Sequence, residues 1–223
     1  MLTIDKSVCT RYPETKVGIL ALQGVTPAAP ADEAVTRDAM AEIFGRYAQM
    51  DRAALKTLSP IRFYCDYYRR FGYSYHVLGQ LESVLKGKMQ LRAESGVLQS
   101  MFLTEIESML LTAGHDLGTL RLPLTLAVAA GGEPYVSIAG AQTNCVNGDL
   151  MICDGAGVIS SILRGPDQKT RITGTTTDVV FTLYAPPGVE ETQLLPALET
   201  LADRVRACAP GAKTAHLSIY TAV

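Results

Sequence analysis

The sequence predicts an α+β fold, in which helices and strands occupy separate stretches of the chain. An apolar run at residues 16–25 is typical of a buried strand. Apolar residues then recur at helical spacing over about residues 31–114, and short alternating or β-branched runs fill about residues 120–223. This order favours a layered α+β arrangement over a series of βαβ units.

The bulk composition is that of an ordinary folded protein. Of the 223 residues, 48% are hydrophobic and 19% are charged, far from the composition of disordered chains. We expect residues 1–223 to form one domain, since single folds of about 250 residues are common. No run of 18 apolar residues occurs and the N-terminal residues lack an apolar signal segment, so we expect a cytoplasmic protein with no membrane partner.

Four helices are predicted in the first half of the chain. Apolar residues recur at helical spacing over residues 35–49, 59–72, 75–87 and 96–114. The second helix has the clearest start, because Ser59 suits an N-cap and Pro60 suits the first helical position. The fourth places the sequence LTAGHD, residues 111–116, at the exit of a buried helix.

Strands are predicted in the second half, separated by turn signals rich in glycine. They cover residues 125–130, 134–140, 149–154, 157–165, 178–185 and 215–223. The dipeptide Asn147-Gly148 between two such runs predicts a hairpin. One helix interrupts the strands at residues 188–209, where leucines recur on one face.

The charge balance argues against a general attraction to nucleic acid. Twenty basic and 22 acidic residues give a formal net charge of −2. Any contact with RNA has to come from a local patch, for which a solvated helix face is the alternative interpretation. The candidates, which lie close together in the sequence, are Arg62, Arg69, Arg70, Lys86, Lys88 and Arg92.

The sequence predicts no metal and no cofactor. The five cysteines are scattered and never form a CxxC pair, so we expect free thiols. The three histidines have no ligand spacing, and both common phosphate-binding loop patterns, GxGxxG and GxxxxGK[ST], are absent.

Three local motifs are open to two interpretations each. His115 with Asp116 could be a general base with an orienting carboxylate, or Asp116 could cap a turn while His115 bonds to backbone. The threonine run at residues 170–177 could line a polar pocket or could face water. Ser160 and Ser161 lack the strand-to-helix elbow of a GxSxG nucleophile, which favours small polar residues on a strand.

Read in order, the segments HDLGTL, GGEPYVSIAG and GDLMICDGAGVISSILRGPDQKTRITGTTTDVVF form a recognisable set. This set resembles the B3/B4 domain of the β subunit of bacterial phenylalanyl-tRNA synthetase. SPIRFYCDYYRRFG and YHVLGQLESVLKG resemble the helical part of free-standing B3/B4 proteins, so the likeness spans roughly residues 55–185. It implies a three-layer α+β fold, with packed helices and a β-sandwich of unusual topology.

The resemblance also implies a pocket, which in the synthetase accepts tyrosine wrongly attached to phenylalanine tRNA and hydrolyses the ester. It makes His115 the candidate catalytic residue. The candidate substrate-binding residues are Asp116, Glu133, Asp154, Ser160, Ser161, Gly165, Thr176 and Thr177. Two positions depart from the family pattern: its histidine falls at Ala113 and its editing-site glutamate falls near Thr182. These departures weaken the interpretation as a hydrolase.

Three functions follow as hypotheses. The first is a free-standing B3/B4 protein that binds tRNA or aminoacyl-tRNA, or hydrolyses tyrosine from phenylalanine tRNA as an editing enzyme. A complete phenylalanine-tRNA ligase is not expected, because 223 residues leave no room for the separate catalytic domain. The second is a module that binds an amino-acid-like small molecule in the same pocket without catalysis. The third is a structural subunit of an assembly.

Overall fold

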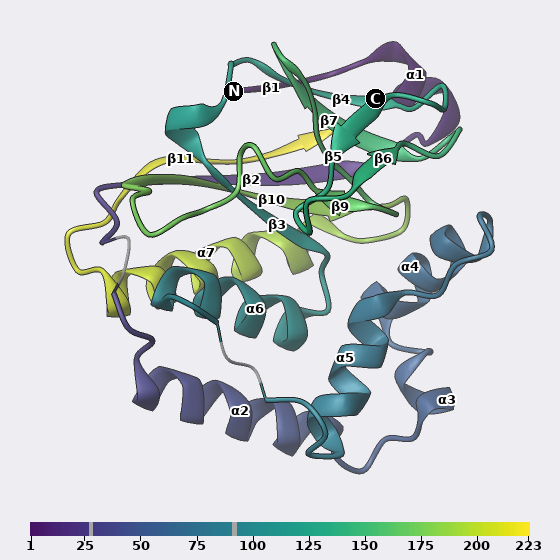
Figure 1. Ribbon diagram of the computed structural model, residues 1–223. Helices are drawn as coiled ribbons and strands as arrows, with labels where there is room; N and C mark the ends of the chain where they lie inside the picture. The colour runs from purple at the N-terminus through teal and green to yellow at the C-terminus, as the bar shows by residue number, and fades with distance from the viewer. Residues whose placement is uncertain (27–28, 91–92) are drawn as a thin grey trace.

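The computed structural model describes residues 1–26, 29–90 and 93–223 and confirms the α+β class (Figure 1). A sheet of four antiparallel strands lies at its centre, in the order β11-β2-β10-β3. These strands are β11 (Lys213–Thr221), β2 (Lys16–Gln23), β10 (Asp178–Ala185) and β3 (Thr112–Asp116). Strands β2 and β10 are almost completely buried, which explains their nearly continuous apolar sequences.

A second sheet lies over one face of the central sheet (Figure 1). Its five strands are β1 (Leu2–Ile4), β4 (Leu124–Val128), β7 (Leu150–Asp154), β8 (Gly157–Ser161) and β9 (Gly165–Pro166), in that order. Strands β1 and β4 are parallel and the other pairs are antiparallel. A hairpin of β5 (Pro134–Val136) and β6 (Gln142–Asn144) stands beside it.

Helices α6 (Gly96–Ser108) and α7 (Glu191–Cys208) cover the other face of the central sheet, and α2 (Glu33–Tyr47) packs on α6 (Figure 1). The second sheet, the central sheet and the helices therefore form successive layers in that order. A separate group of helices stands at one side of these layers: α3 (Arg52–Leu55), α4 (Ser59–Arg69) and α5 (His76–Leu85). Two short elements complete the chain, α1 (Lys6–Arg11) and the 3₁₀ turn η1 (Leu117–Thr119).

Three buried tyrosines of α4 attach this side group to both sheets. The hydroxyl of Tyr64 donates a hydrogen bond to the carbonyl oxygen of Tyr184 on β10. Tyr67 donates to the buried carboxylate of Asp149 at 2.7 Å, and Tyr68 donates at 2.7 Å to a carbonyl just after β8. The tyrosine-rich sequence of α4 thus fixes the position of the helices that border the cavity described below.

The helices predicted at residues 35–49, 59–72, 75–87 and 188–209 are confirmed, but the prediction for residues 96–114 is wrong at its end. Helix α6 stops at Ser108, because Met109 adopts the left-handed conformation with φ of 60°. The LTAGHD segment is not the exit of a helix. Its residues 112–116 form β3, which pairs with β10.

Two smaller predictions are also wrong. Ser59 is the first residue of α4 and not its N-cap, and its hydroxyl bonds to Gln193 of α7. The Asn147-Gly148 turn does not close a hairpin, because β6 before it pairs with β5 and β7 after it pairs with β4 and β8. The two runs that flank the turn belong to different sheets.

The Tyr67 hydroxyl gives a test of how α4 is attached. It donates to Asp149 and accepts from the backbone N–H of Leu150 at 2.7 Å. Replacing Tyr67 by Phe should lower the free energy of unfolding by about 1–3 kcal/mol, because the buried N–H loses its partner and the carboxylate loses a donor. Urea denaturation measures the loss. Tyr73→Phe, at an exposed position, is the control and should change the free energy of unfolding by less than about 0.5 kcal/mol. Equal losses in the two variants would show that the Tyr67 hydroxyl does not stabilise the attachment of α4.

Candidate functional site

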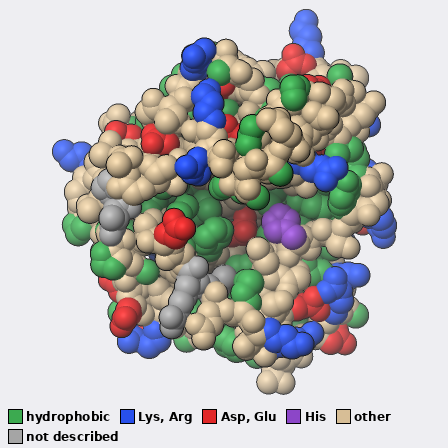
Figure 2. Space-filling view, in the orientation of Figure 1, with side chains coloured by type: hydrophobic (Ala, Val, Ile, Leu, Met, Phe, Trp, Pro, Cys, Tyr) green, Lys and Arg blue, Asp and Glu red, His purple; other side chains and the backbone are tan. Residues whose placement is uncertain are grey.

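A cavity of about 770 Å³ opens at the free edge of β3. Helices α5 and α6 form one wall, and the β8–β9 turn with residues 171–174 forms the other. Figure 2 shows the hollow in the middle of one face, where hydrophobic side chains gather beside an acidic and a histidine side chain. A volume in this range is typical of pockets for small organic molecules, about 300–1,000 Å³.

The wall formed by β3 is closely packed at Gly114. A Cβ atom on Gly114 would lie 2.9 Å from Cδ1 of Ile172 and 3.0 Å from the sulfur of Met101. Ile172 and Met101 both line the cavity, on opposite walls. Glycine at position 114 therefore keeps the two walls close together and the cavity narrow at this point.

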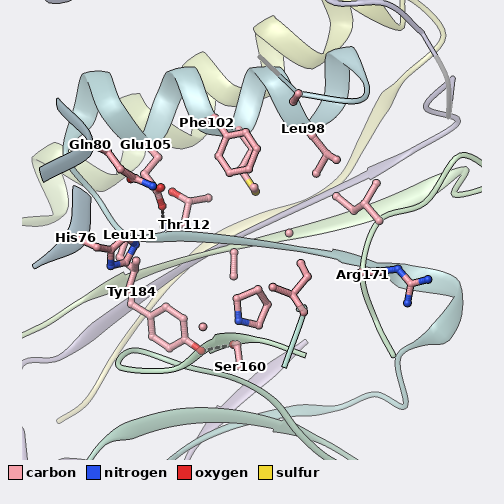
Figure 3. A pocket seen from close by; sticks show the side chains of 18 of the residues that line it. His76, Gln80, Leu98, Phe102, Glu105, Leu111, Thr112, Ser160, Arg171 and Tyr184 are labelled. Atoms are coloured by element: carbon pink, nitrogen blue, oxygen red, sulfur yellow. Dashed lines mark hydrogen bonds between the residues drawn. The ribbon is translucent and has the colours of Figure 1, made fainter. Parts of the chain in front are cut away.

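Glu105 of α6 is the buried carboxyl group of the cavity (Figure 3). Only 5% of the residue is exposed, and its Oε2 atom accepts a hydrogen bond of 2.8 Å from the backbone N–H of Thr112. Burial raises the pKa of this carboxyl to about 7, although the bond from Thr112 acts in the opposite direction. At neutral pH both the protonated and the ionised form of this carboxyl are therefore populated.

Two polar side chains of α5 lie near Glu105 at the cavity wall, as Figure 3 shows. Within the described part of the chain, the buried Oε1 atom of Gln80 has no hydrogen-bond partner. His76 lies at the exposed rim, where its Nδ1 is 3.4 Å from the hydroxyl of Tyr68. Partial desolvation lowers the pKa of His76, so its ring is mostly neutral at pH 7. This part of the cavity offers several acceptors to a ligand.

The part of the cavity that borders the second sheet contains a hydroxyl pair. Tyr184 of β10 and Ser160 of β8 are hydrogen-bonded through their side chains and thereby connect the two sheets (Figure 3). Burial raises the pKa of Tyr184 well above its usual value of 10, so the phenol stays protonated. The pair can donate and accept hydrogen bonds but does not ionise at neutral pH.

The structure brings three of the predicted residues into the cavity wall: Ser160, Ser161 and Gly165. It places His115 elsewhere. His115 is completely buried on β3, on the sheet face that Tyr184 shares, and its Nδ1 lies 2.7 Å from the hydroxyl of Thr170. Burial lowers the pKa of His115 to about 4, so its ring is neutral. It does not line the cavity.

The other predicted residues stabilise turns and do not line the cavity. Asp116 caps η1 through the backbone N–H of Gly118, as one of the two interpretations expected, and accepts from the hydroxyl of Thr176. Thr177 bonds to the neighbouring Asp178. Glu133 accepts two backbone N–H groups of its own turn, and Asp154 accepts those of Arg121 and Ala156.

The two positions that depart from the family pattern are neighbours in space. Ala113 on β3 is paired directly with Thr182 on β10. Ala113 lines the cavity, and the Thr182 hydroxyl is buried without a hydrogen-bond partner in the described structure.

Glu105, Gln80 and Tyr184 were not predicted. Glu105 left a signal in the sequence, because it stands four residues after Met101 and directly before Ile106 in an apolar stretch. A charged residue on the buried side of a helix is rarely without a partner or a function. Gln80 and Tyr184 left no comparable signal.

The described basic residues among the sequence candidates do not line the cavity. Arg62 and Arg69 share one face of α4, Lys86 and Lys88 are exposed beyond α5, and Arg92 lies outside the described residues. Among the described residues, no group of three His, Cys, Asp or Glu side chains could hold a metal ion. No described helix is both long and apolar enough to cross a membrane.

Neither a family model nor a curated protein sequence matches the chain. Among solved structures, it is similar to an N-terminal fragment of the phenylalanyl-tRNA synthetase β subunit from Pyrococcus horikoshii. The TM-score is 0.49, the sequence identity is 12%, and the match covers 96% of this chain and 50% of that one. The chain thus spans about half the length of the solved fragment, and the likeness concerns the arrangement of elements alone.

The burial of Glu105 predicts a dependence of stability on pH. Its pKa of about 7 in the folded chain exceeds the ordinary value of 4.5, so the folded state holds a proton that the unfolded state loses. As the pH rises from about 4.5 to 7, this group should therefore lower the free energy of unfolding by roughly 3 kcal/mol in total. Each unit of difference between the two pKa values contributes about 1.4 kcal/mol.

Glu105→Gln keeps an acceptor for Thr112 and cannot ionise, so its stability relative to the wild type should increase from pH 5 to pH 8. Thermal or urea unfolding across this range measures the difference. The exposed Glu199→Gln on α7 is the control. Parallel pH profiles of Glu105→Gln and wild type would show that Glu105 titrates normally.

Proposed function

We propose that the chain is a B3/B4-type domain whose cavity binds an amino-acid-like small molecule. The ordered set of segments in the sequence supports the family assignment. The observation that carries the binding function is the carboxyl of Glu105 buried at the wall of an otherwise largely apolar cavity.

The chemistry of the lining fits a ligand with a cationic group and an apolar body. The carboxylate of Glu105 and the amide oxygen of Gln80 are acceptors that suit an ammonium group. The side chains of Leu98, Met101 and Phe102 offer an apolar surface on the same side of the cavity. A hydroxyl on the ligand can bond with the Tyr184–Ser160 pair, on the side of the second sheet.

Isothermal titration calorimetry with three related compounds tests this function. Tyramine carries the amine and the phenol, tyrosine adds a carboxylate, and 3-(4-hydroxyphenyl)propionate lacks the amine. Tyramine and tyrosine should bind more tightly than the propionate. Glu105→Gln should weaken tyramine binding by about tenfold or more, because a charge-assisted hydrogen bond is lost. The Glu199→Gln control should bind like the wild type; equal affinity for all three compounds would remove the proposed role of Glu105.

A second candidate function is hydrolysis of the ester in mischarged aminoacyl-tRNA. Glu105 favours it, because a carboxyl with a pKa of about 7 can take a proton from water at neutral pH. His115 is less suited to this role, because it lies outside the cavity and is completely buried. Glu105 is therefore the general base that this version of the proposal requires.

Release of tyrosine from mischarged phenylalanine tRNA measures the reaction. Glu105→Gln should lower the rate by about 10²-fold or more, the usual contribution of a general base. His115→Gln should have a much smaller effect on the rate of the folded protein. If wild type and both variants release tyrosine at the uncatalysed rate, hydrolysis is excluded and the binding function stands alone.

A further inference from the structure

A second hollow, of about 330 Å³, lies on the group of helices at the side of the sheets. It is bordered by α3, by one face of α4, and by the turn of residues 73–75 that leads into α5. Its polar lining includes Arg52, Lys56, Arg62, Cys65, Asp66 and Arg69. Its size is near the lower limit for small-molecule pockets.

Positive charge dominates this hollow, although the whole chain carries a formal charge of −2. Four cationic side chains line it and two of them are paired: Arg52 with Glu82, and Arg69 with Asp66. Lys56 and Arg62 have no carboxylate within ion-pair distance among the described residues. The hollow therefore keeps about two uncompensated positive charges.

The geometry of the cationic groups suits a compact anion. Arg62, Asp66 and Arg69 follow one another at helical spacing on α4, while Arg52 and Lys56 approach from α3. The guanidinium of Arg62 lies 4.6 Å from the centre of the Phe63 ring, which restricts its orientation. The floor is formed by the buried Tyr75 and Leu78.

This hollow is separate from the cavity that contains Glu105. Both involve α5, but His76 and Gln80 point to the cavity and Leu78 lines the hollow. Residues two positions apart on a helix face opposite sides, so α5 stands between the two sites. Occupancy of one site does not require occupancy of the other.

We propose that this hollow binds the phosphate monoester group of a small phosphorylated molecule. A monoester carries about two negative charges at neutral pH and three terminal oxygens, which matches two uncompensated cations and the planar donors of arginine. A concave site of this size encloses the end of a molecule. An internal phosphodiester of a long nucleic acid would instead need a continuous basic groove.

The experiment compares AMP with adenosine, and inorganic phosphate with buffer, by calorimetry at low salt. AMP should bind and adenosine should not, and phosphate should compete with AMP. The double variant Lys56→Gln with Arg62→Gln should weaken AMP binding by about tenfold or more. The matched control, Lys86→Gln with Lys88→Gln, removes the same charge from exposed positions outside the hollow and should leave binding unchanged.

Cys65 gives a second readout, because it lines the hollow. AMP should protect Cys65 from alkylation by iodoacetamide, as followed by peptide mass spectrometry. Cys9 on α1, also half-buried and outside the hollow, should react at the same rate with and without AMP.

Three results would overturn the proposal. The first is equal binding of AMP and adenosine. The second is an equal loss of affinity in the two double variants, which would indicate general electrostatic attraction. The third is binding of an oligonucleotide without terminal phosphates that inorganic phosphate cannot displace, which would identify the surface as a nucleic-acid site.

Discussion

The hydrogen bond from the Thr112 backbone to the Glu105 carboxylate holds together the part of the chain on which the site depends. It connects the last turns of α6 with the first residue of β3, across the left-handed turn at Met109. The carboxyl that accepts this hydrogen bond also lines the cavity. The Glu105 carboxyl is therefore buried at the junction between helix and strand. This burial raises its pKa and lowers the free energy of unfolding at neutral pH.

The cavity exists because β3 is a short strand at the edge of the central sheet. Its five residues pair with β10 on one side only, so the other side is free to border a pocket. Gly114 lets both walls approach, and the α4 tyrosines hold the side group of helices against the sheets. The edge strand and its surroundings thus leave room for a ligand where another strand could otherwise pair.

The sequence predicted the elements whose patterns are local. The buried strand β2, the helices α2, α4, α5 and α7, and the strand-rich second half all follow from hydrophobic period and turn residues. It failed where tertiary pairing decides the structure: residues 112–114 were predicted as the end of a helix, yet they belong to a strand that pairs with β10. The Asn147-Gly148 turn failed for the same reason, because its flanking runs found partners in different sheets.

The site was predictable to a similar extent. Ser160, Ser161 and Gly165 were expected in the wall and lie there. A strand and the glycine turn that follows it stay adjacent in space whichever strands they pair with. The carboxyl groups of Asp154 and Glu133 instead accept hydrogen bonds from nearby backbone N–H groups, and residue spacing alone cannot show which of the two roles a carboxyl takes. Glu105 is marked in the sequence only as a charge within an apolar stretch, and its place in the cavity depends on the packing of α6 against β3.

If Glu105 faces a ligand-binding cavity as a buried carboxyl, it should ionise near neutral pH and respond to a bound cation. A carbon-13 NMR titration of its side-chain carboxyl, assigned with Glu105→Gln and repeated with saturating tyramine, measures both properties. We expect a midpoint near pH 7 in the free protein and a lower midpoint with tyramine, because an ammonium group favours the carboxylate. A midpoint near 4.5 that tyramine does not move would contradict this expectation.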